Sequence, residues 1–424
     1  MRAEDLLVLY RSGRLTADEV KAHLRAMATS AADLPLTEGQ RGLWALQRTY
    51  PESAAYNVPL GLRLIEPHDR AALREAVRWL GRRWPALGGR VVLVDGAPCL
   101  RPDGADLAVE TQEAASWSEA AHRAWIEDRV RAPFDLERGP LLRGSLLHDG
   151  DETLVLLVVH HVIFDSSSFP LVMEAVVEAY QALAEGNVPA FPATDASGYL
   201  AYQAREQSRL TGAEGARRLA YWREVLSDLP APLDLPTDHA RGPAPSFAGA
   251  SFCRALPASL GQEVRDFAAA RGLFASTVLL GAWQGLLARL SGRDDLVVGM
   301  PVDQREAATQ GLVGPFMEML PVRSAGLGDG PFGEALAGLQ RRLLDGMAQV
   351  LPFPALVREL GLGLGERSPV FETAFLYQDP VQPPAWELSR DLHQEGEYEL
   401  ALEVVAVEDG FGLHLKYDPT LFEA

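Results

Sequence analysis

The chain has few cysteines, no long apolar run and no export signal, and each lack excludes a class of protein. Cys99 and Cys253 have no close spacing partner, so the sequence supports neither a zinc site nor a redox pair, and we expect two unpaired core thiols. No apolar run reaches the ~18 residues that a membrane helix needs. The N-terminus lacks the basic-then-apolar order of a secretory signal. We therefore expect a cytoplasmic protein with no membrane partner.

Basic residues are also scarce. The 39 Lys and Arg residues face 58 Asp and Glu residues, which gives a formal net charge of −19. Binding to a phosphate backbone needs a basic face, so the sequence predicts no nucleic-acid partner. No glycine-rich phosphate loop follows a strand in the required pattern either.

The chain has 424 residues, more than a single hydrophobic core usually holds, so two lobes are expected. Because 47% of the residues are apolar, the chain is expected to be globular. Residues 1–28 predict two short helices that form an appended leader. A proline-rich stretch at 186–247, with a single helix over 199–229, is the expected connection between the lobes. The predicted division is therefore a leader at 1–28, an N-terminal lobe at 29–195 and a C-terminal lobe at 196–424.

One segment of the N-terminal lobe combines a buried strand with ionisable side chains. Strands are predicted at 141–148 and 152–159, and the second is a continuous apolar run of the kind that is buried on both faces. It ends in His160 and His161. Asp165 and the serines after it are suited to cap the helix predicted at 169–185. Because neighbouring side chains of a strand point to opposite faces, one histidine can face a cavity while the other faces the core.

Several uses of these side chains are open at this point. A positioned imidazole is a standard general base, and Asp165, four residues after His161, could turn back to orient the loop. The two histidines could instead ligate a metal or serve only the fold. Ser166 to Ser168 could belong to a Ser-His-Asp triad, although no G-x-S-x-G elbow is present.

Beyond this segment, residues 34–424 resemble the condensation domains of nonribosomal peptide synthetases, with several motifs in the family's order. HHVIFDS at 160–166 resembles the active-site motif His-His-x-x-x-Asp-Gly. The other matching segments are LTEGQRGLW at 36–44, YNVP at 56–59, PFDL at 133–136, GPLLR at 139–143, YW at 221–222, LPTD at 235–238, DDLVVGMP at 294–301 followed by Arg305, GPF at 314–316, FET at 371–373 and YDPTLF at 417–422.

The resemblance implies an α/β fold of two chloramphenicol-acetyltransferase-like lobes that form a V with a central tunnel. It implies that His161 is the catalytic residue and that His160 faces inward and holds the loop. Asp165 would be mainly structural and would form a salt bridge with an arginine of the second lobe, for which Arg305 is the candidate. The chain itself would bind no cofactor and no metal, because donor and acceptor carrier proteins supply the phosphopantetheine arms.

The sequence departs from the family pattern at three places. Ser166 stands where the motif has glycine. The second family motif, Arg-His-x-x-Leu-Arg, is replaced over residues 83–88 by RWPALG, so Trp84 and Gly88 stand for its histidine and second arginine. The family's last helix, after residues 421–422, has no counterpart, so we expect a piece of a longer polypeptide.

The resemblance predicts amide bond formation between a carrier-bound acyl or peptidyl thioester and a carrier-bound aminoacyl acceptor. One alternative is an acyltransferase with a free amine or alcohol as acceptor, since the same base serves either nucleophile. A second is a degenerate domain that only binds carriers or recruits enzymes. Residues 1–28 resemble leaders of hybrid polyketide–peptide assembly lines, so an upstream polyketide synthase module is a further expected partner.

Overall fold

The computed structural model divides into two compact units. The first takes the chain up to Ala204 and adds two later segments, Arg305–Phe316 and Val381–Gln394; the second consists of Arg205–Gln304, Met317–Pro380 and Glu395–Ala424. The first unit therefore extends past the lobe boundary predicted at residue 195 and takes in segments from the C-terminal half. The described residues are 33–65, 67–104, 106–190, 196–231, 233–242, 245–324, 331–362, 368–378, 386–388, 392, 396, 398–408 and 410–423. The predicted leader at 1–28 lies outside them.

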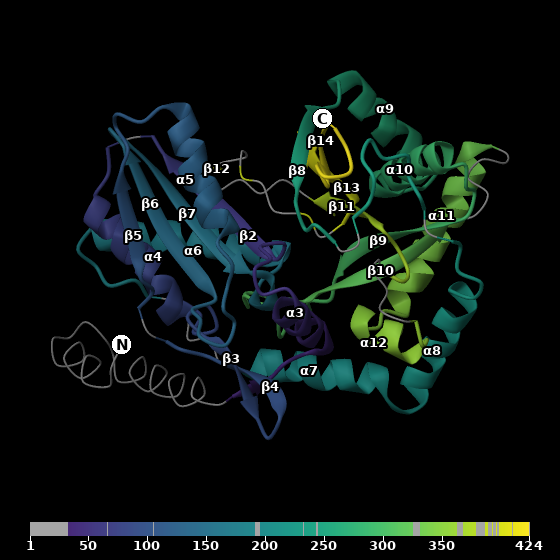
Figure 1. The fold of residues 1–424 in the computed structure, drawn as a ribbon, viewed down its shortest axis with the longest axis horizontal. Helices are drawn as coiled ribbons and strands as arrows, with labels where there is room; N and C mark the ends of the chain where they lie inside the picture. The colour runs from purple at the N-terminus through teal and green to yellow at the C-terminus, as the bar shows by residue number, and fades with distance from the viewer. Residues whose placement is uncertain are drawn as a thin grey trace. The chain divides into compact units, whose positions relative to one another are not determined.

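The first unit contains a five-stranded sheet of order β12-β2-β7-β6-β5 (Figure 1). Its central strand β7 is buried from Thr153 to His160, as its continuous apolar run predicts. β7 pairs antiparallel with both neighbours, whereas β5 runs parallel to β6. The strands are β2 (Asn57–Leu64), β5 (Val109–Glu113), β6 (Leu142–Asp149), β7 (Glu152–His160) and β12 (Glu387–Leu388).

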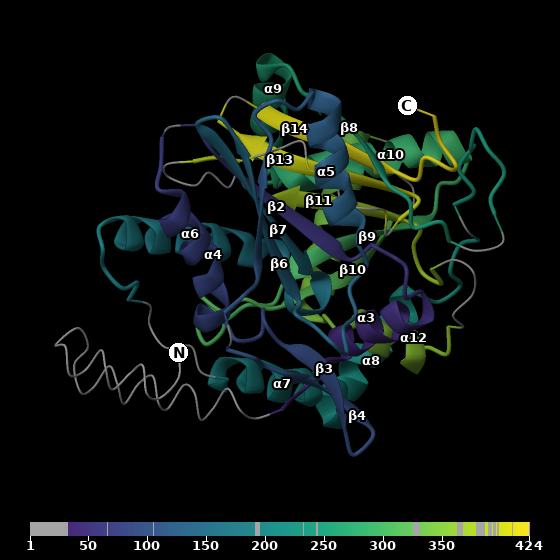
Figure 2. The ribbon, with the colours of Figure 1, turned by 60° about the vertical axis from the view of Figure 1, so that its left-hand side comes forward.

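Helices cover both faces of this sheet. The helices α4 (Arg70–Arg83) and α6 (Phe169–Ala184) pack against each other, and the views in Figures 1 and 2 place α5 (Glu119–Arg131) on the opposite face. α4 begins where Asp69 caps it, because the Asp69 carboxylate accepts the N–H groups of Ala71 and Ala72. A smaller sheet is formed by β1 (Leu34–Pro35), β4 (Ala97–Arg101) and β3 (Arg90–Val94), and α3 (Glu38–Thr49) follows β1.

The second unit is built on a six-stranded sheet of order β10-β9-β11-β13-β14-β8. The helices α9 (Ala258–Ala269), α10 (Ala275–Ser291) and α11 (Phe332–Ala348) pack on it (Figure 1), and α8 (Gly212–Val225) and α12 (Phe353–Glu359) pack together. The strands are β8 (Ala250–Ala255), β9 (Leu296–Asp303), β10 (Met317–Ser324), β11 (Thr373–Gln378), β13 (Leu400–Val407) and β14 (Gly410–Tyr417).

Two predictions of local structure are wrong. The single helix predicted over 199–229 is two helices, α7 (Ser197–Leu210) and α8. The chain leaves the helical conformation at Thr211, which is extended, and at Gly212, which has a φ of +67°. Cys99 is buried, but Cys253 is exposed, because it lies on β8 at the edge of the sheet. None of the helices in the described part of the chain combines the length and apolar character needed to cross a membrane.

Candidate functional site

The two histidines lie where β7 ends and the chain turns toward α6. After His160 the backbone forms a short 3₁₀ turn, His161–Ile163, and a second one, Ser166–Ser168, leads into α6. The strand thus ends in a loop that is held between two rigid elements, as is common for residues that carry out chemistry.

His160 is fully buried. Its Nδ1 accepts the N–H of Val162 at 3.0 Å, which leaves the proton on Nε2, 3.3 Å from the Oε1 atom of Gln47. Burial, reinforced by the nearby His161 and Arg143, lowers the pKa of His160 to about 3. His160 is therefore a neutral imidazole that faces the interior and is bonded to the loop through the Val162 N–H.

His161 has the opposite surroundings, because its side chain is partly exposed while its backbone is fixed. Its N–H donates to the carbonyl oxygen of Tyr56 at 2.8 Å, and its own carbonyl accepts the N–H of Phe164 at 3.3 Å. The Tyr56 ring stands edge-on to the imidazole, with ring centroids 6.4 Å apart and planes at 84°. His161 is thus the imidazole of the pair that can reach a bound molecule.

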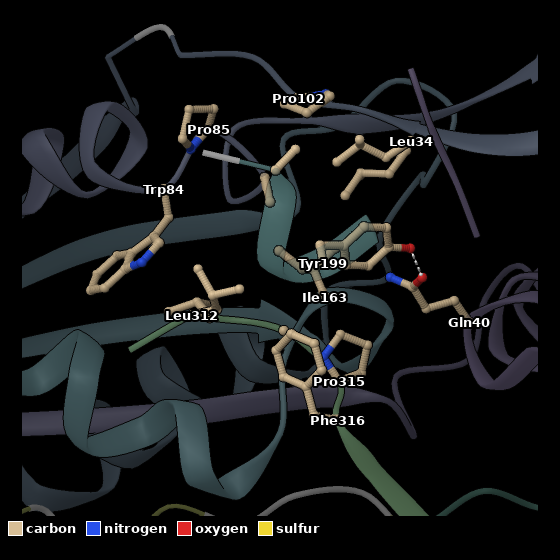
Figure 3. A pocket seen from close by; sticks show the side chains of 15 residues that line it. Leu34, Gln40, Trp84, Pro85, Pro102, Ile163, Tyr199, Leu312, Pro315 and Phe316 are labelled. Atoms are coloured by element: carbon tan, nitrogen blue, oxygen red, sulfur yellow. Dashed lines mark hydrogen bonds between the residues drawn. The ribbon is translucent and has the colours of Figure 1, made fainter. Parts of the chain in front are cut away.

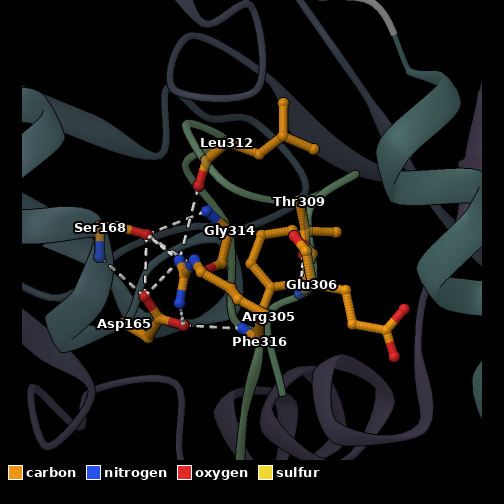
Figure 4. A network of polar contacts seen from close by, with 8 residues as sticks. All are labelled: Asp165, Ser168, Arg305, Glu306, Thr309, Leu312, Gly314 and Phe316. Atoms are coloured by element: carbon orange, nitrogen blue, oxygen red, sulfur yellow. Dashed lines mark hydrogen bonds and ion pairs between the residues drawn. The ribbon is translucent and has the colours of Figure 1, made fainter. Parts of the chain in front are cut away.

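Asp165 is the centre of a buried polar network (Figure 4). Its two carboxylate oxygens accept hydrogen bonds from the two terminal nitrogens of Arg305, at 2.7 and 2.8 Å. The exposed fraction is 0% for the Asp165 side chain and 8% for the Arg305 side chain. The same carboxylate accepts the N–H of Phe316 at 2.7 Å and both the N–H and the hydroxyl of Ser168 at 2.9 Å. The bidentate geometry suits a guanidinium held away from water.

The structure therefore brings Asp165 together with Arg305, and it does so within the first unit, through the segment Arg305–Phe316. The partners of Asp165 are Ser168, Arg305 and Phe316, so this carboxylate orders the loop and the start of α6 and does not bind the His161 ring. Arg305 also stacks over the Phe316 ring, 4.7 Å from its centroid.

Ser168 belongs to the Asp165 network, a role that the sequence analysis did not assign to it. Its buried hydroxyl lies 2.9 Å from Arg305, 3.1 Å from the Gly314 N–H and 3.1 Å from the Gly314 carbonyl oxygen. Nothing in the local pattern distinguishes Ser168 from Ser166 and Ser167, because its distant partners, Arg305 and Gly314, lie 137 and 146 residues further along the chain. The hydroxyl of Ser168 is engaged by Asp165, Arg305 and Gly314, so this serine gives no geometry for a Ser-His-Asp triad.

Ser166, which replaces the motif glycine, is the first residue of the second 3₁₀ turn and is partly exposed. Its carbonyl accepts the N–H of Phe169. The backbone of Ser166 does not enter the positive-φ region, where only glycine is free of strain. The serine is therefore accommodated without a backbone cost.

An apolar pocket lies within the first unit, and Ile163 of the loop contributes to its lining (Figure 3). The empty space between its walls is about 680 Å³, part of it open to solvent. Trp84, which replaces the family's motif histidine, lines one side, and the pair Gln40 and Tyr199 forms a polar corner (Figure 3). The other lining residues are Leu34, Pro85, Ala86, Leu100, Pro102, Ile163, Ala196, Leu312, Val313, Gly314, Pro315 and Phe316.

A metal site would need several ligating side chains close together. In the part of the chain that the structure describes, no group of three or more His, Cys, Asp or Glu side chains could hold a metal ion. The two histidines face different surroundings, with His160 engaged by Gln47 and Val162, so they do not form a ligand pair.

Comparison with known proteins agrees with this arrangement. The family model for the condensation domain matches residues 30–424. The chain belongs to the condensation-domain family. Polyketide synthase PksN of Bacillus subtilis (strain 168) is 36% identical over 405 residues, which are 92% of this condensation domain and 7% of PksN. The chain thus spans less than a tenth of that relative.

Solved structures share the fold of this condensation domain. The X-domain from teicoplanin biosynthesis superposes with a TM-score of 0.82 at 24% identity, over 92% of this chain and 91% of that one. The first condensation domain of the calcium-dependent antibiotic synthetase, in complex with a substrate analogue, gives a TM-score of 0.77 at 23% identity, over 92% of each chain. The predicted resemblance to nonribosomal peptide synthetase condensation domains and the predicted two-lobe α/β fold class are confirmed.

Proposed function

We propose that this condensation domain forms an amide bond between a carrier-bound acyl or peptidyl thioester donor and a carrier-bound aminoacyl acceptor. The observation that carries the proposal is the contrast between the two histidines: His160 is buried and neutral, whereas His161 is partly exposed on a backbone that Tyr56 and Phe164 hold. A fixed imidazole that can reach a bound substrate is suited to proton transfer.

In the proposed step the acceptor amine attacks the carbonyl carbon of the donor thioester. A C–N bond forms and the C–S bond breaks. The proton of the amine passes to the unprotonated ring nitrogen of His161, which then gives the same proton to the leaving thiolate of the donor arm, so that protons and charge balance. The phosphopantetheine arms belong to the carrier proteins, and an upstream polyketide synthase module that contacts residues 1–28 would deliver the donor.

The test is to mix acyl-loaded donor carrier with aminoacyl-loaded acceptor carrier and to follow both carriers by intact mass. We expect His161→Ala to lower the rate of product formation about 10²–10⁴-fold, which is the usual contribution of a general base. The control is His122→Ala, which removes an imidazole of α5 from the same unit and leaves the rate unchanged.

Three outcomes separate the candidate functions. Undiminished product from the His161→Ala variant contradicts the role of His161. Product with a soluble amine or alcohol, in the absence of the acceptor carrier, favours the acyltransferase with a free acceptor. Carrier binding without turnover of any donor identifies a domain that only binds or recruits.

A further inference from the structure

The peptide groups that follow His161 are held by side chains from two directions. The N–H of Val162, in the peptide bond that leaves His161, donates to His160 Nδ1 at 3.0 Å. The carbonyl oxygen of Val162, in the next peptide bond, accepts Nε2–H of Gln40 at 2.7 Å. Because both bonds are buried, they fix the plane of the turn that carries the His161 side chain.

Gln40 is itself held in a defined orientation. Only 1% of this residue is exposed. Its Oε1 accepts the hydroxyl of Tyr199 at 2.6 Å and the N–H of Thr37 at 3.0 Å, so its amide cannot turn over without losing both bonds (Figure 3). Tyr199 comes from α7 and Thr37 precedes α3, so two separate elements aim the Gln40 amide nitrogen at the loop.

Capping of α3 does not account for this arrangement. Thr37 and Gln40 form a capping box, in which Gln40 Oε1 accepts the N–H of Thr37 and the Thr37 hydroxyl accepts the N–H of Gln40. The capping box uses only the oxygen end of the Gln40 side chain. The nitrogen end points instead to Val162, 122 residues later in the chain, where a buried carbonyl would otherwise lose its donor.

We propose that Gln40 is a positioning residue for His161, and that Tyr199 keeps the Gln40 amide in the required orientation. Gln40 touches no reacting atom in this proposal; it acts through the Val162 carbonyl. The kinetic part of the proposal rests on the proposed function of His161, whereas its structural part concerns the loop alone.

The test replaces Gln40 by methionine, which has a similar shape and no amide. We expect kcat to fall about 10–100-fold, because a displaced catalytic group is costly, while KM for each loaded carrier stays within about threefold. In NMR spectra the His161 ring signal, which is assigned because it is absent from His161→Ala, should shift. The backbone amide hydrogens of Val162 and Phe164 should exchange faster with solvent.

Gln284→Met provides a matched control. Gln284 is a fully buried glutamine of α10 in the second unit, and its Nε2 donates to the carbonyl oxygen of Val322 at 3.0 Å. This variant loses the same kind of bond and should show a comparable drop in melting temperature. Its kcat and its His161 resonance should match those of the unaltered protein.

A second variant, Tyr199→Phe, keeps the Gln40 amide and removes only the hydroxyl that orients it. We expect the same changes as in Gln40→Met, smaller in size. The proposal is overturned if Gln40→Met and Tyr199→Phe leave the His161 resonance and the loop amides as they are in Gln284→Met. If the unaltered protein forms no product with any loaded pair, the proposed function fails, and the resonance and exchange data still decide the role of Gln40.

Discussion

Two identical side chains, adjacent in sequence, differ in burial and in bonding because the strand ends between them. His160 lies at the end of a strand that is buried on both faces, and both of its ring nitrogens have protein partners. His161 begins the 3₁₀ turn and is partly exposed. Burial makes the charged form of His160 unfavourable, so this imidazole stays neutral.

The lowered pKa of His160 predicts a loss of stability in acid. With a pKa of about 3 in the folded state and ~6.5 when unfolded, the unfolded chain binds the additional proton between these values. The free energy of unfolding is therefore not reduced by His160 above the unfolded pKa, and it falls as the pH drops below that value. Between pH 7.5 and pH 5 the loss is about 2 kcal/mol from this residue.

His160→Asn measures this contribution, because asparagine does not titrate and its Oδ1 can still accept the Val162 N–H. Urea unfolding at both pH values should show the unaltered protein losing about 2 kcal/mol more than the variant. Equal losses in the two proteins would show that His160 is not held neutral by the fold.

Within α10, one of two glycines marks a place where two helices approach each other closely. Gly281 of α10 faces α11, and a Cβ atom at this position would clash with Cδ2 of the buried Leu336. Gly285, one turn later on the same helix, has no atom from outside its own stretch of helix within 4 Å of the position of a Cβ. Close helix packing therefore requires a glycine at position 281 but not at position 285, and the sequence of α10 does not show this difference.

Alanine substitutions at the two positions should have opposite effects. Gly281→Ala should destabilise the protein by about 1–3 kcal/mol, because the core must shift to admit the methyl group. Gly285→Ala should stabilise it by up to about 1 kcal/mol, since alanine favours the helix over glycine. Thermal unfolding compares them directly, and a stabilising Gly281→Ala would show that the contact between α10 and α11 is looser than described.

At the scale of the whole molecule, each unit has its own apolar core, and neither unit is a continuous stretch of chain. The segment Arg305–Phe316 follows β9 of the second unit in sequence and belongs to the first unit in space. Its attachment there is the buried ion pair between Arg305 and Asp165, together with the bonds from Ser168 and Phe316. A buried carboxylate is stable only while its partner is present.

Loss of this partner should therefore destabilise the first unit. Arg305→Met leaves Asp165 buried without its cation, and we expect a cost of about 3–5 kcal/mol in chemical unfolding. The matched control is Arg101→Met, which breaks another bidentate pair of the same unit, that with Asp33, where 46% and 23% of the two side chains are exposed. The control should have little effect, because water replaces the lost partner.

Hydrogen exchange should place the effect of Arg305→Met in peptides that cover residues 161–169 and 305–316. Equal destabilisation by the two arginine variants would show that the Asp165 site is open to water. Faster exchange confined to the second unit would show that the segment is held by other contacts.

Local sequence alone determined much of this protein. The strands at 142–149 and 152–160 and the helix α6 follow from a continuous apolar run and a change of periodicity within a short stretch of chain. The same stretch places two histidines at the end of the strand, and the family resemblance selected His161 as the candidate base. The ordered motifs identified the family. Such patterns can be read because they arise between residues that are close in sequence.

Tertiary structure decided the rest. Sequence did not mark Ser168 or the bond from Gln40 to Val162, and it placed a single helix where Gly212 separates two. It named Arg305 only through the family resemblance, since the residue lies 140 positions from Asp165 and no local pattern joins them. These contacts depend on which elements pack together and on how deeply each polar group is buried, and those quantities exist only in the folded chain.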